Sequence, residues 1–339
     1  MKVQELIKSL DVVIKSKQVA FIQGSPGIGK SDIVKAMADK YGLKLIDVRL
    51  SQCDPTDLSG LPRFKDNIAQ FVPFDIFPLA NTPVPSGFNG WLIFLDEINA
   101  APKAVQAAAY KLILDRMVGQ NQLHKNVIIV CAGNKETDGA ITNTISTALR
   151  SRFITLPLEP DYESWIEWAD EHEIDYRIKA YIRFKKNDGL YDFNPEETDN
   201  VYACPRSWNM LNKLMSKMTE DIGEYTPLIL GTIGNQAYYF IDFCLYAVKI
   251  PDIDTILNGT AVRDPSWDVG MRCIICEYIT NNADLITNET QAKNVVTFLD
   301  AMGREYSIPF YHSAYKKNPK LMTFNAVSQK MREYAVWLN

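Results

Sequence analysis

The sequence predicts an α/β fold in which a five-stranded parallel sheet flanked by helices is followed by a part that is helical throughout. Two observations support this expectation. Up to about residue 158, short apolar, β-branched runs alternate with segments of helical periodicity, as in a parallel sheet covered by helices. From Asp161 onward, strand signals largely disappear and amphipathic helical segments continue to Asn339. The expected domains are 1–158, 159–220 and 221–339.

The strands of the predicted sheet are short apolar runs, each followed by turn-forming or polar residues. They are Val19–Gln23, Leu45–Arg49, Trp91–Leu95, Val127–Ala132 and Phe153–Leu156. Between the second and third of them, the proline-rich stretch 73–85 cannot be the interior of a sheet or helix, because proline lacks the amide hydrogen. Just before it, Pro62–Phe71 predicts a small hairpin that turns at Asp66 and Asn67.

Composition places the chain among ordinary globular proteins. Of its 339 residues, 47% are hydrophobic and 23% charged, and no apolar run approaches the roughly 18 residues of a membrane span. Met1–Ile7 reads as the start of an amphipathic helix rather than a signal peptide. The net charge of −5 argues against a broad basic surface for nucleic acid. We therefore expect a cytoplasmic protein that does not bind membranes.

Six cysteines are scattered along the chain. Cys131 lies inside an apolar run, where a small buried thiol is common. Cys273 and Cys276 have the C-x-x-C spacing of metal and redox sites, but no second pair follows and the chain has only three histidines. We therefore expect these two cysteines to pack in the core.

The most informative segment fits the phosphate-binding pattern G-x-x-x-x-G-K-[ST]. It lies between an apolar strand and the helical segment Ser31–Lys40, so its backbone N–H groups and the helix N-terminus would converge on a phosphate. Lys30 would reach the β- and γ-phosphates, and the Ser31 hydroxyl would hold Mg²⁺. The alternative is a glycine-rich turn that binds nothing. The expected ATP-binding residues are Gly24, Ser25, Pro26, Gly27, Ile28, Gly29, Lys30 and Ser31.

Polar residues at the ends of two further strands would complete such a site. Asp96 and Glu97 directly follow the apolar strand 91–95. Asp96 would orient Mg²⁺ beside Ser31, and Glu97 would polarise the attacking water. Asn134 follows the strand 127–132, and its amide could bond both the γ-phosphate and the water. The alternatives are a solvated loop for the acidic pair and an ordinary turn for Asn134.

Three arginines follow. Arg150 and Arg152 stand where a helix ends and the next strand begins, and Arg206 follows Pro205 in the first turn of an expected helix. That helix start would aim Arg206 toward the nucleotide. The plainer interpretations are a helix-dipole partner for the first two and a surface arginine for the third.

In their order and approximate spacing, these motifs resemble the AAA+ ATPases over about residues 15–215. Two details are similar to the MoxR-like branch. Asp57–Gly60 resembles its segment after the second strand, and Leu95–Gln106 resembles its stretch L-D-E-I-N-x-A-P-x-x-V-Q.

The resemblance implies a P-loop AAA+ core, a helical lid and ATP hydrolysis with Mg²⁺. Asn134 matches sensor 1, and Arg206 matches sensor 2 on the lid. Arg152 matches the arginine finger, which acts on ATP held by the neighbouring subunit, with Arg150 as a second candidate that many family members lack. The family forms homo-oligomeric rings, usually hexamers, that remodel a protein client, often with a von Willebrand A-domain partner. The hairpins 62–71 and 117–123 would face the pore.

Two other functions stay open from the sequence. A nucleic-acid motor would need basic residues at the pore, where the hairpins offer Arg63 and Lys65, with His124 and Lys125 nearby. A small-molecule P-loop kinase would need an acceptor pocket and no arginine from a neighbouring subunit.

Overall fold

The computed structural model describes residues 1–66, 68–138, 145, 147–197 and 201–334. The chain divides into two compact units. The first contains Met1–Pro160 and a short segment after residue 193, and the second contains Asp161–Phe193 and the chain from residue 201 onward. Each unit is described by itself.

The first unit is built on a five-stranded sheet in the order β2-β5-β8-β1-β9, and every neighbouring pair is parallel. The strands are β1 Ala20–Gln23, β2 Leu43–Arg49, β5 Gly90–Asp96, β8 Val127–Gly133 and β9 Ile154–Pro157. The predicted sheet is thus confirmed, with ends shifted by one or two residues. Strand β2 begins two residues earlier than predicted because Leu43 pairs with Gly90 at the start of β5.

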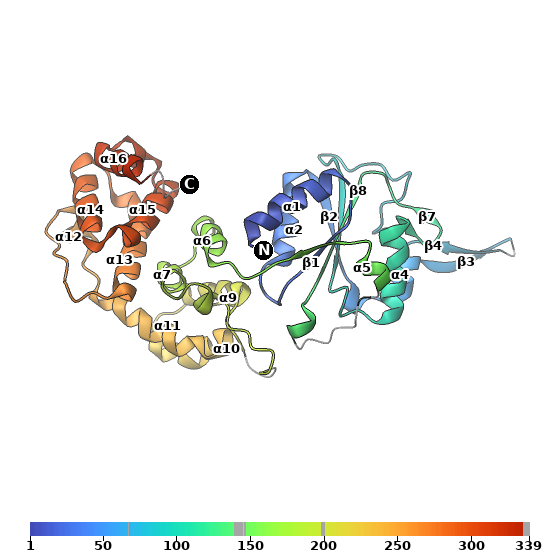
Figure 1. The fold of residues 1–339 in the computed structure, drawn as a ribbon, viewed down its shortest axis with the longest axis horizontal. Coiled ribbons are helices and arrows are strands. Elements are labelled where there is room, and N and C mark those ends of the chain that lie inside the picture. Colours follow the sequence, from blue (N-terminus) through green and yellow to red (C-terminus); the bar gives the residue numbers. More distant parts are fainter. Residues whose placement is uncertain (67, 139–144, 146, 198–200, 335–339) are drawn as a thin grey trace. The chain divides into compact units, whose positions relative to one another are not determined.

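Helices cover both faces of this sheet (Figure 1). The chain leaves β1 through α2 toward β2, and it leaves β5 through α4 in the opposite direction toward β8. Since such crossovers are right-handed, α2 and α4 lie on opposite faces, and the strands between them are apolar on both sides. The helices are α1 Val3–Lys15, α2 Lys30–Lys40, α3 Pro55–Ser59, α4 Lys103–Leu114 and α5 Thr147–Arg150.

Two hairpins lie in the loops of this unit. Strands β3 (Leu61–Lys65) and β4 (Ile68–Val72) pair in antiparallel register with Lys65 opposite Ile68, which confirms the hairpin predicted at 62–71. Asp66 occupies the turn at φ 49°, whereas Asn67 lies outside the described residues. The second hairpin joins β6 (Met117–Val118) and β7 (Asn121–Gln122).

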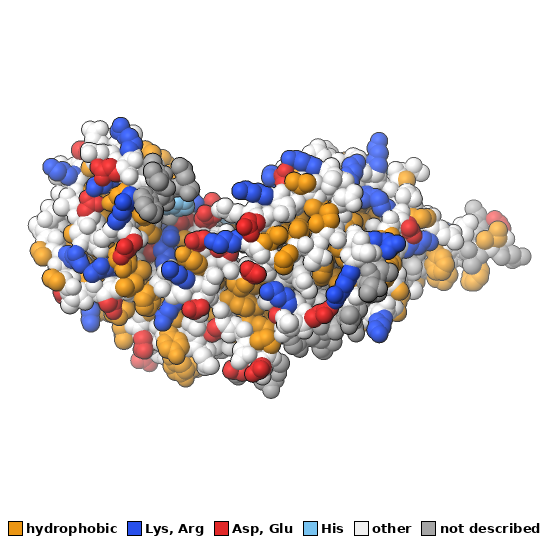
Figure 2. Space-filling model, viewed as in Figure 1, with side chains coloured by type: hydrophobic (Ala, Val, Ile, Leu, Met, Phe, Trp, Pro, Cys, Tyr) orange, Lys and Arg blue, Asp and Glu red, His pale blue; other side chains and the backbone are white. Residues whose placement is uncertain are grey.

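Apolar side chains remain exposed on the β3–β4 hairpin (Figure 2). Phe64 is 78% exposed and Ile68 61%, and Leu61, Phe71 and Val72 are also exposed. A cluster of exposed apolar residues on one projecting element is typical of a surface that contacts another molecule.

The second unit is helical, as predicted, and contains no strand among its described residues. Its helices are α6 Tyr162–Glu171, α7 Tyr176–Lys185, α8 Asn187–Leu190, α9 Pro205–Met215, α10 Thr226–Ile233, α11 Gln236–Cys244, α12 Ile253–Leu257, α13 Val269–Asn281, α14 Glu289–Met302, α15 Arg304–Lys317 and α16 Asn325–Glu333.

One continuous apolar core runs through this unit, from Trp165 on α6 to Tyr334 after α16. Helix α7 packs on α13, and α13 packs on α15. The expected lid and the expected C-terminal region therefore lie in one compact unit, and a boundary at residue 220 stays a prediction.

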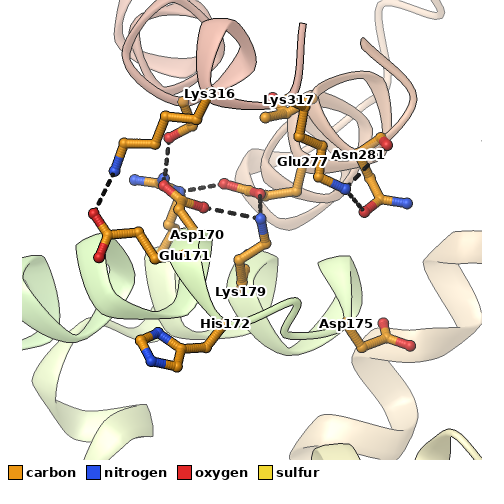
Figure 3. A network of polar contacts seen from close by, with 12 residues as sticks. Asp170, Glu171, His172, Asp175, Lys179, Glu277, Asn281, Lys316 and Lys317 are labelled. Atoms are coloured by element: carbon orange, nitrogen blue, oxygen red, sulfur yellow. Dashed lines mark hydrogen bonds and ion pairs between the residues drawn. The ribbon is translucent and has the colours of Figure 1, made fainter. Parts of the chain in front are cut away.

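Four ionised side chains are enclosed where α6, α7 and α13 meet (Figure 3). Lys179 Nζ lies 2.9 Å from Asp170 Oδ1 and 3.3 Å from Glu277 Oε2. Arg183, one turn further along α7, bonds Glu277 through Nε and lies 3.7 Å from Asp170. On α15, the Ser313 hydroxyl donates to Asp170. We call the four charged residues the ion cluster.

No helix in the described part of the chain is long and apolar enough to cross a bilayer. The six cysteines are free thiols. Cys276 is 2% exposed on α13, as expected for a core residue, and Cys273 is half-buried. Burial raises the pKa of the Cys273 thiol to about 12. A thiol with so high a pKa is unreactive near neutral pH, which fits packing rather than redox chemistry.

Candidate active site

The phosphate loop connects β1 to α2, and its glycines supply the backbone that a phosphate cradle needs. Gly27 has φ 79° and Gly29 has φ 95°, and a side chain at either position would be strained. Helix α2 begins at Lys30, directly after Gly29. The loop therefore delivers the positive end of the α2 dipole to the place where the phosphates are expected.

Lys30 is buried within this loop, with 8% of its surface exposed. Its ammonium donates hydrogen bonds to the backbone oxygens of Gly24 (2.5 Å) and Ser25 (3.0 Å) and to Asn134 Oδ1 (3.0 Å). The phosphate loop and the strand end at Asn134 thus meet at one ammonium group.

The predicted magnesium ligands are also neighbours. Ser31 Oγ lies 3.3 Å from Asp96 Oδ2, at the carboxyl end of β5. A hydroxyl and a carboxylate are the hard oxygen donors that Mg²⁺ prefers, and Mg²⁺ takes its other ligands from water and phosphate. No cluster of three or more acidic, histidine or cysteine ligands occurs among the described residues, so a complete protein cage is not the arrangement here. The donor set fits a Mg²⁺ ion held jointly with a nucleotide.

The carboxyl edge of the sheet is acidic around these ligands. Arg49, the last residue of β2, lies opposite Asp96 in the sheet register. Asp47 lies two residues before Arg49 on the same strand. Partial burial raises the pKa of the Asp47 carboxyl, and the nearby Asp96 carboxylate raises it further. Such a concentration of negative charge favours a divalent cation at this edge.

Glu97, the predicted water-activating residue, adopts φ 57°, which is uncommon for a residue with a side chain. Its backbone N–H donates to Asp96 Oδ1 (2.8 Å), and its carboxylate accepts a hydrogen bond from the Ser51 hydroxyl. Ser51 is not among the residues predicted from the sequence. It follows β2, whose carboxyl end is adjacent to that of β5, and the strand order could have indicated it.

Asn134 stands at the end of β8, between the phosphate-loop strand β1 and the acidic strand β5, as predicted. The side chain of Asn99, 2% exposed, donates to the Asn134 carbonyl (2.7 Å) and accepts from the Asn134 N–H (3.1 Å). Asn99 was also not identified as a site residue. An amide among the apolar residues that follow the acidic pair could have signalled it, because an amide buried there would need partners nearby.

A third residue outside the prediction, Asp138, lies in the short 3-10 helix η2 (Glu136–Asp138) after β8. It is buried and contacts the Ser25 hydroxyl. Glu136, in the same turn, forms an exposed ion pair with Arg150. No local pattern in the sequence points to either contact, since they depend on how the chain folds back after β8.

The arginines are less closely gathered than the other predicted residues. Arg150 ends α5 and Arg152 follows it, both exposed on the first unit. Arg152 Nη1 contacts Ser151 Oγ at 3.4 Å. Arg206 is exposed in the first turn of α9, where Pro205 is the first residue as predicted, and it belongs to the second unit. The roles of all three stay predictions.

Together the fold and the site define a P-loop nucleotide-binding core of the AAA+ class with a helical part after it. Residues 20–153 match the family model of the AAA domain, dynein-related subfamily. This segment contains the phosphate loop, the acidic pair, Asn134 and both Arg150 and Arg152. Residues 20–153 therefore form an AAA domain, and the protein is an ATPase.

Solved structures are similar at low sequence identity. The RuvB Holliday junction branch migration motor of Thermotoga maritima is 14% identical over 76% of this chain and 74% of its own, with a TM-score of 0.39. A presumed ATPase of Cytophaga hutchinsonii is 16% identical over 92% and 80%, with a TM-score of 0.38. NtrX of Brucella abortus is 13% identical over 88% and 68%, with a TM-score of 0.40.

Proposed function

We propose that this chain is a Mg²⁺-dependent ATPase of the MoxR-like branch that works as a homo-oligomeric ring and remodels a protein client in the cytoplasm. The observation that carries the ATPase part is that the phosphate loop and Asn134 meet at the Lys30 ammonium, while the adjoining Ser31 contacts Asp96. The six free thiols support a reducing compartment.

In the proposed reaction, the residues of the chain bind ATP and prepare a water molecule for attack on the γ-phosphate. The phosphate loop and Lys30 hold the phosphates, and Ser31 with Asp96 holds Mg²⁺, which neutralises charge on them. Glu97 takes the proton of the water as it attacks, in an orientation that Ser51 helps to fix. Asn134 orients that water, and its backbone is held by one hydrogen bond that it accepts from the Asn99 side chain and one that it donates to it.

The catalytic base is tested by Glu97→Gln. This change keeps the shape of the side chain but removes the base, so ATP binding should persist while hydrolysis falls by about 10²-fold or more. Steady-state ATPase assays and binding of a fluorescent ATP analogue measure the two properties. Hydrolysis at the wild-type rate would refute the role of Glu97.

The ring is supported by the exposure of Arg152 on the first unit and by the MoxR-like motif. An arginine supplied by a neighbouring subunit would neutralise charge on the γ-phosphate and make assembly depend on nucleotide. Light scattering with a non-hydrolysable analogue should therefore give a mass several times 38.4 kDa. A monomer at tens of micromolar with analogue bound would exclude an arginine shared between subunits.

A mixing experiment tests Arg152 directly. Arg152→Ala and Lys30→Ala subunits should each be inactive alone, yet a mixture should regain activity where an intact pocket meets an intact arginine. In the matched control, Arg152→Ala subunits are mixed with the Lys30→Ala/Arg152→Ala double variant in place of Lys30→Ala. The double variant supplies no arginine at position 152, so the activity should not recover. Arg150→Ala should lose less activity than Arg152→Ala, because Arg150 already pairs with Glu136 of its own chain.

The exposed apolar side chains of the β3–β4 hairpin favour a protein client over a phosphate backbone. A Glu97→Gln ring should retain a client from a cell extract, and the same ring with Phe64→Asp and Ile68→Asp should not. A von Willebrand A-domain protein among the retained clients would agree with the MoxR-like motif. Stimulation of the ATPase by DNA or RNA, lost on changing Arg63 and Lys65, would instead favour the nucleic-acid motor.

A further inference from the structure

Asp138 is a buried carboxylate beside a loop that must receive phosphate. It is 6% exposed, and both its oxygens accept hydrogen bonds. Asp138 Oδ1 accepts from the Ser25 hydroxyl at 3.1 Å, and Oδ2 accepts from the Lys135 backbone N–H at 3.1 Å. One donor belongs to the phosphate loop and the other to the turn that follows Asn134.

These contacts close a ring of bonds around the phosphate loop. From Asp138 the ring passes through Ser25, whose backbone oxygen accepts a hydrogen bond from Lys30 at 3.0 Å. Lys30 also donates to Asn134 Oδ1 at 3.0 Å. Asn134 is covalently joined to Lys135, and the Lys135 backbone N–H donates a hydrogen bond to Asp138 Oδ2, which closes the ring. Every link is a hydrogen bond of ordinary length or a peptide bond.

A buried carboxylate beside a phosphate loop is unfavourable in itself, so we look for what its hydrogen bonds to Ser25 and to the turn after β8 contribute. Burying it costs solvation free energy, and its charge repels the phosphates that the loop binds. A neutral apolar residue would avoid both costs but would leave the Ser25 hydroxyl and the Lys135 N–H without this acceptor. A carboxylate offers acceptors only, which matches two donors arriving from different segments.

We propose that Asp138 is a positioning residue for ATP hydrolysis, which holds the turn after β8 against the phosphate loop and so fixes the amide of Asn134 relative to the γ-phosphate and the attacking water. This inference rests on the proposed function. In this role Asp138 acts through Ser25 and Lys135, not by its own contact with nucleotide or water. Its loss should therefore lower kcat while the loop still binds ATP.

The test compares kcat and ATP affinity in a set of variants. Asp138→Ala should lower kcat by about 10- to 100-fold, the scale of a misplaced reacting group, with the dissociation constant for a fluorescent ATP analogue changed less than about threefold. Asp138→Asn should retain kcat within about threefold. Its amide oxygen can accept from Lys135 and its NH₂ can donate to Ser25 Oγ, because the hydroxyl can rotate.

Two further variants separate positioning from general stability. Ser25→Ala should lower kcat as Asp138→Ala does, and the double variant should be no slower than the slower single variant, because both changes break one link. Asp39→Ala, on the exposed side of α2, is the control and should behave as wild type. Hydrogen exchange at residues 134–138 should rise in Asp138→Ala but not in Asp138→Asn.

The possible failures are distinct. Absence of ATPase activity in the wild type would overturn the proposed function and this inference together. Wild-type kcat in Asp138→Ala would overturn the inference alone. Equal losses of kcat, ATP affinity and melting temperature in both Asp138→Ala and Asp138→Asn would also overturn it, since they would make Asp138 a structural residue only.

Discussion

The two units each bury a lysine, and the surroundings of the two lysines differ. Lys30 of the first unit donates to two backbone carbonyls and an amide oxygen. Lys179 of the second unit lies between the carboxylates of Asp170 and Glu277. Burial alone would lower the pKa of Lys179, but these two carboxylates outweigh it and raise the pKa above its ordinary value.

The difference separates a lysine in a loop shaped for an anion from a lysine whose printed partners are carboxylates. Three neutral oxygens accept hydrogen bonds from the Lys30 ammonium, and it stands in a loop whose geometry suits phosphate. The ion cluster contains two positive and two negative side chains and joins three helices. A buried lysine therefore indicates a ligand-binding site when it lies in a loop shaped to bind an anion. It indicates a structural role when carboxylates of the same unit surround it.

The largest effect is expected from Glu277→Ala, because it leaves Lys179 and Arg183 buried against Asp170 alone. The free energy of unfolding of the second unit should fall by about 3–5 kcal/mol. Denaturant unfolding followed by tryptophan fluorescence measures it, since Trp165 and Trp208 lie in that unit's core. Glu171→Ala, which breaks the exposed pair with Lys316, is the matched control and should change it by no more than about 1 kcal/mol. Similar losses in the two variants would contradict the distinction.

Lys30→Ala should have the opposite signature. ATP affinity should fall by about 10- to 100-fold, because charge-assisted bonds to the phosphates are lost, and hydrolysis should fall with it. The unfolding free energy of the first unit should change by less than about 1 kcal/mol, since removing a buried charge offsets the loss of its hydrogen bonds. Isothermal titration with an ATP analogue and a thermal melt measure the two effects. A variant that binds normally but melts early would make Lys30 a structural residue.

The two regions also differ in how far the sequence could predict them. The phosphate loop could be predicted from a motif of adjacent residues. Asp96 and Asn134 could be predicted to lie near it because parallel strands end at the same edge of a sheet. The same rule, applied to β2, could have indicated Ser51. The Lys179–Glu277 contact spans 98 residues of sequence, and Asp138 reaches Ser25 across 113. Such pairs depend on how helices and loops pack, which no motif of adjacent residues encodes.

A double-mutant cycle sharpens the account of the ion cluster. Lys179→Met with Glu277→Gln removes one charge of each sign and leaves Asp170 opposite Arg183. The loss of unfolding free energy in the double variant should be about 1–3 kcal/mol smaller than the sum of the losses in the two single variants. The reason is that each single change leaves an uncompensated charge. Denaturant unfolding of the four proteins gives this coupling energy. Additive losses would mean that Lys179 and Glu277 act independently.

The smallest effect is a plateau in the pH dependence of the second unit's stability. Burial alone would raise the pKa of Asp170, but Lys179, Ser313 and Arg183 hold it below its ordinary value. The stability it contributes is therefore fully present above the unfolded pKa, about 3.9, and is lost as the pH falls through the lower folded value. The raised pKa of Lys179 has the opposite consequence: its contribution is fully present below about pH 10.4 and is lost as the pH rises through the folded value.

Between about pH 5 and pH 9 neither group changes its charge, so the midpoint of denaturant unfolding, followed by tryptophan fluorescence, should stay nearly constant. In Lys179→Met the acid limb should move to higher pH, because Asp170 loses the first of the groups that lower its pKa. A midpoint that drifts steadily across the plateau in wild type, or an acid limb unmoved in Lys179→Met, would show that the ion cluster does not govern the stability of this unit.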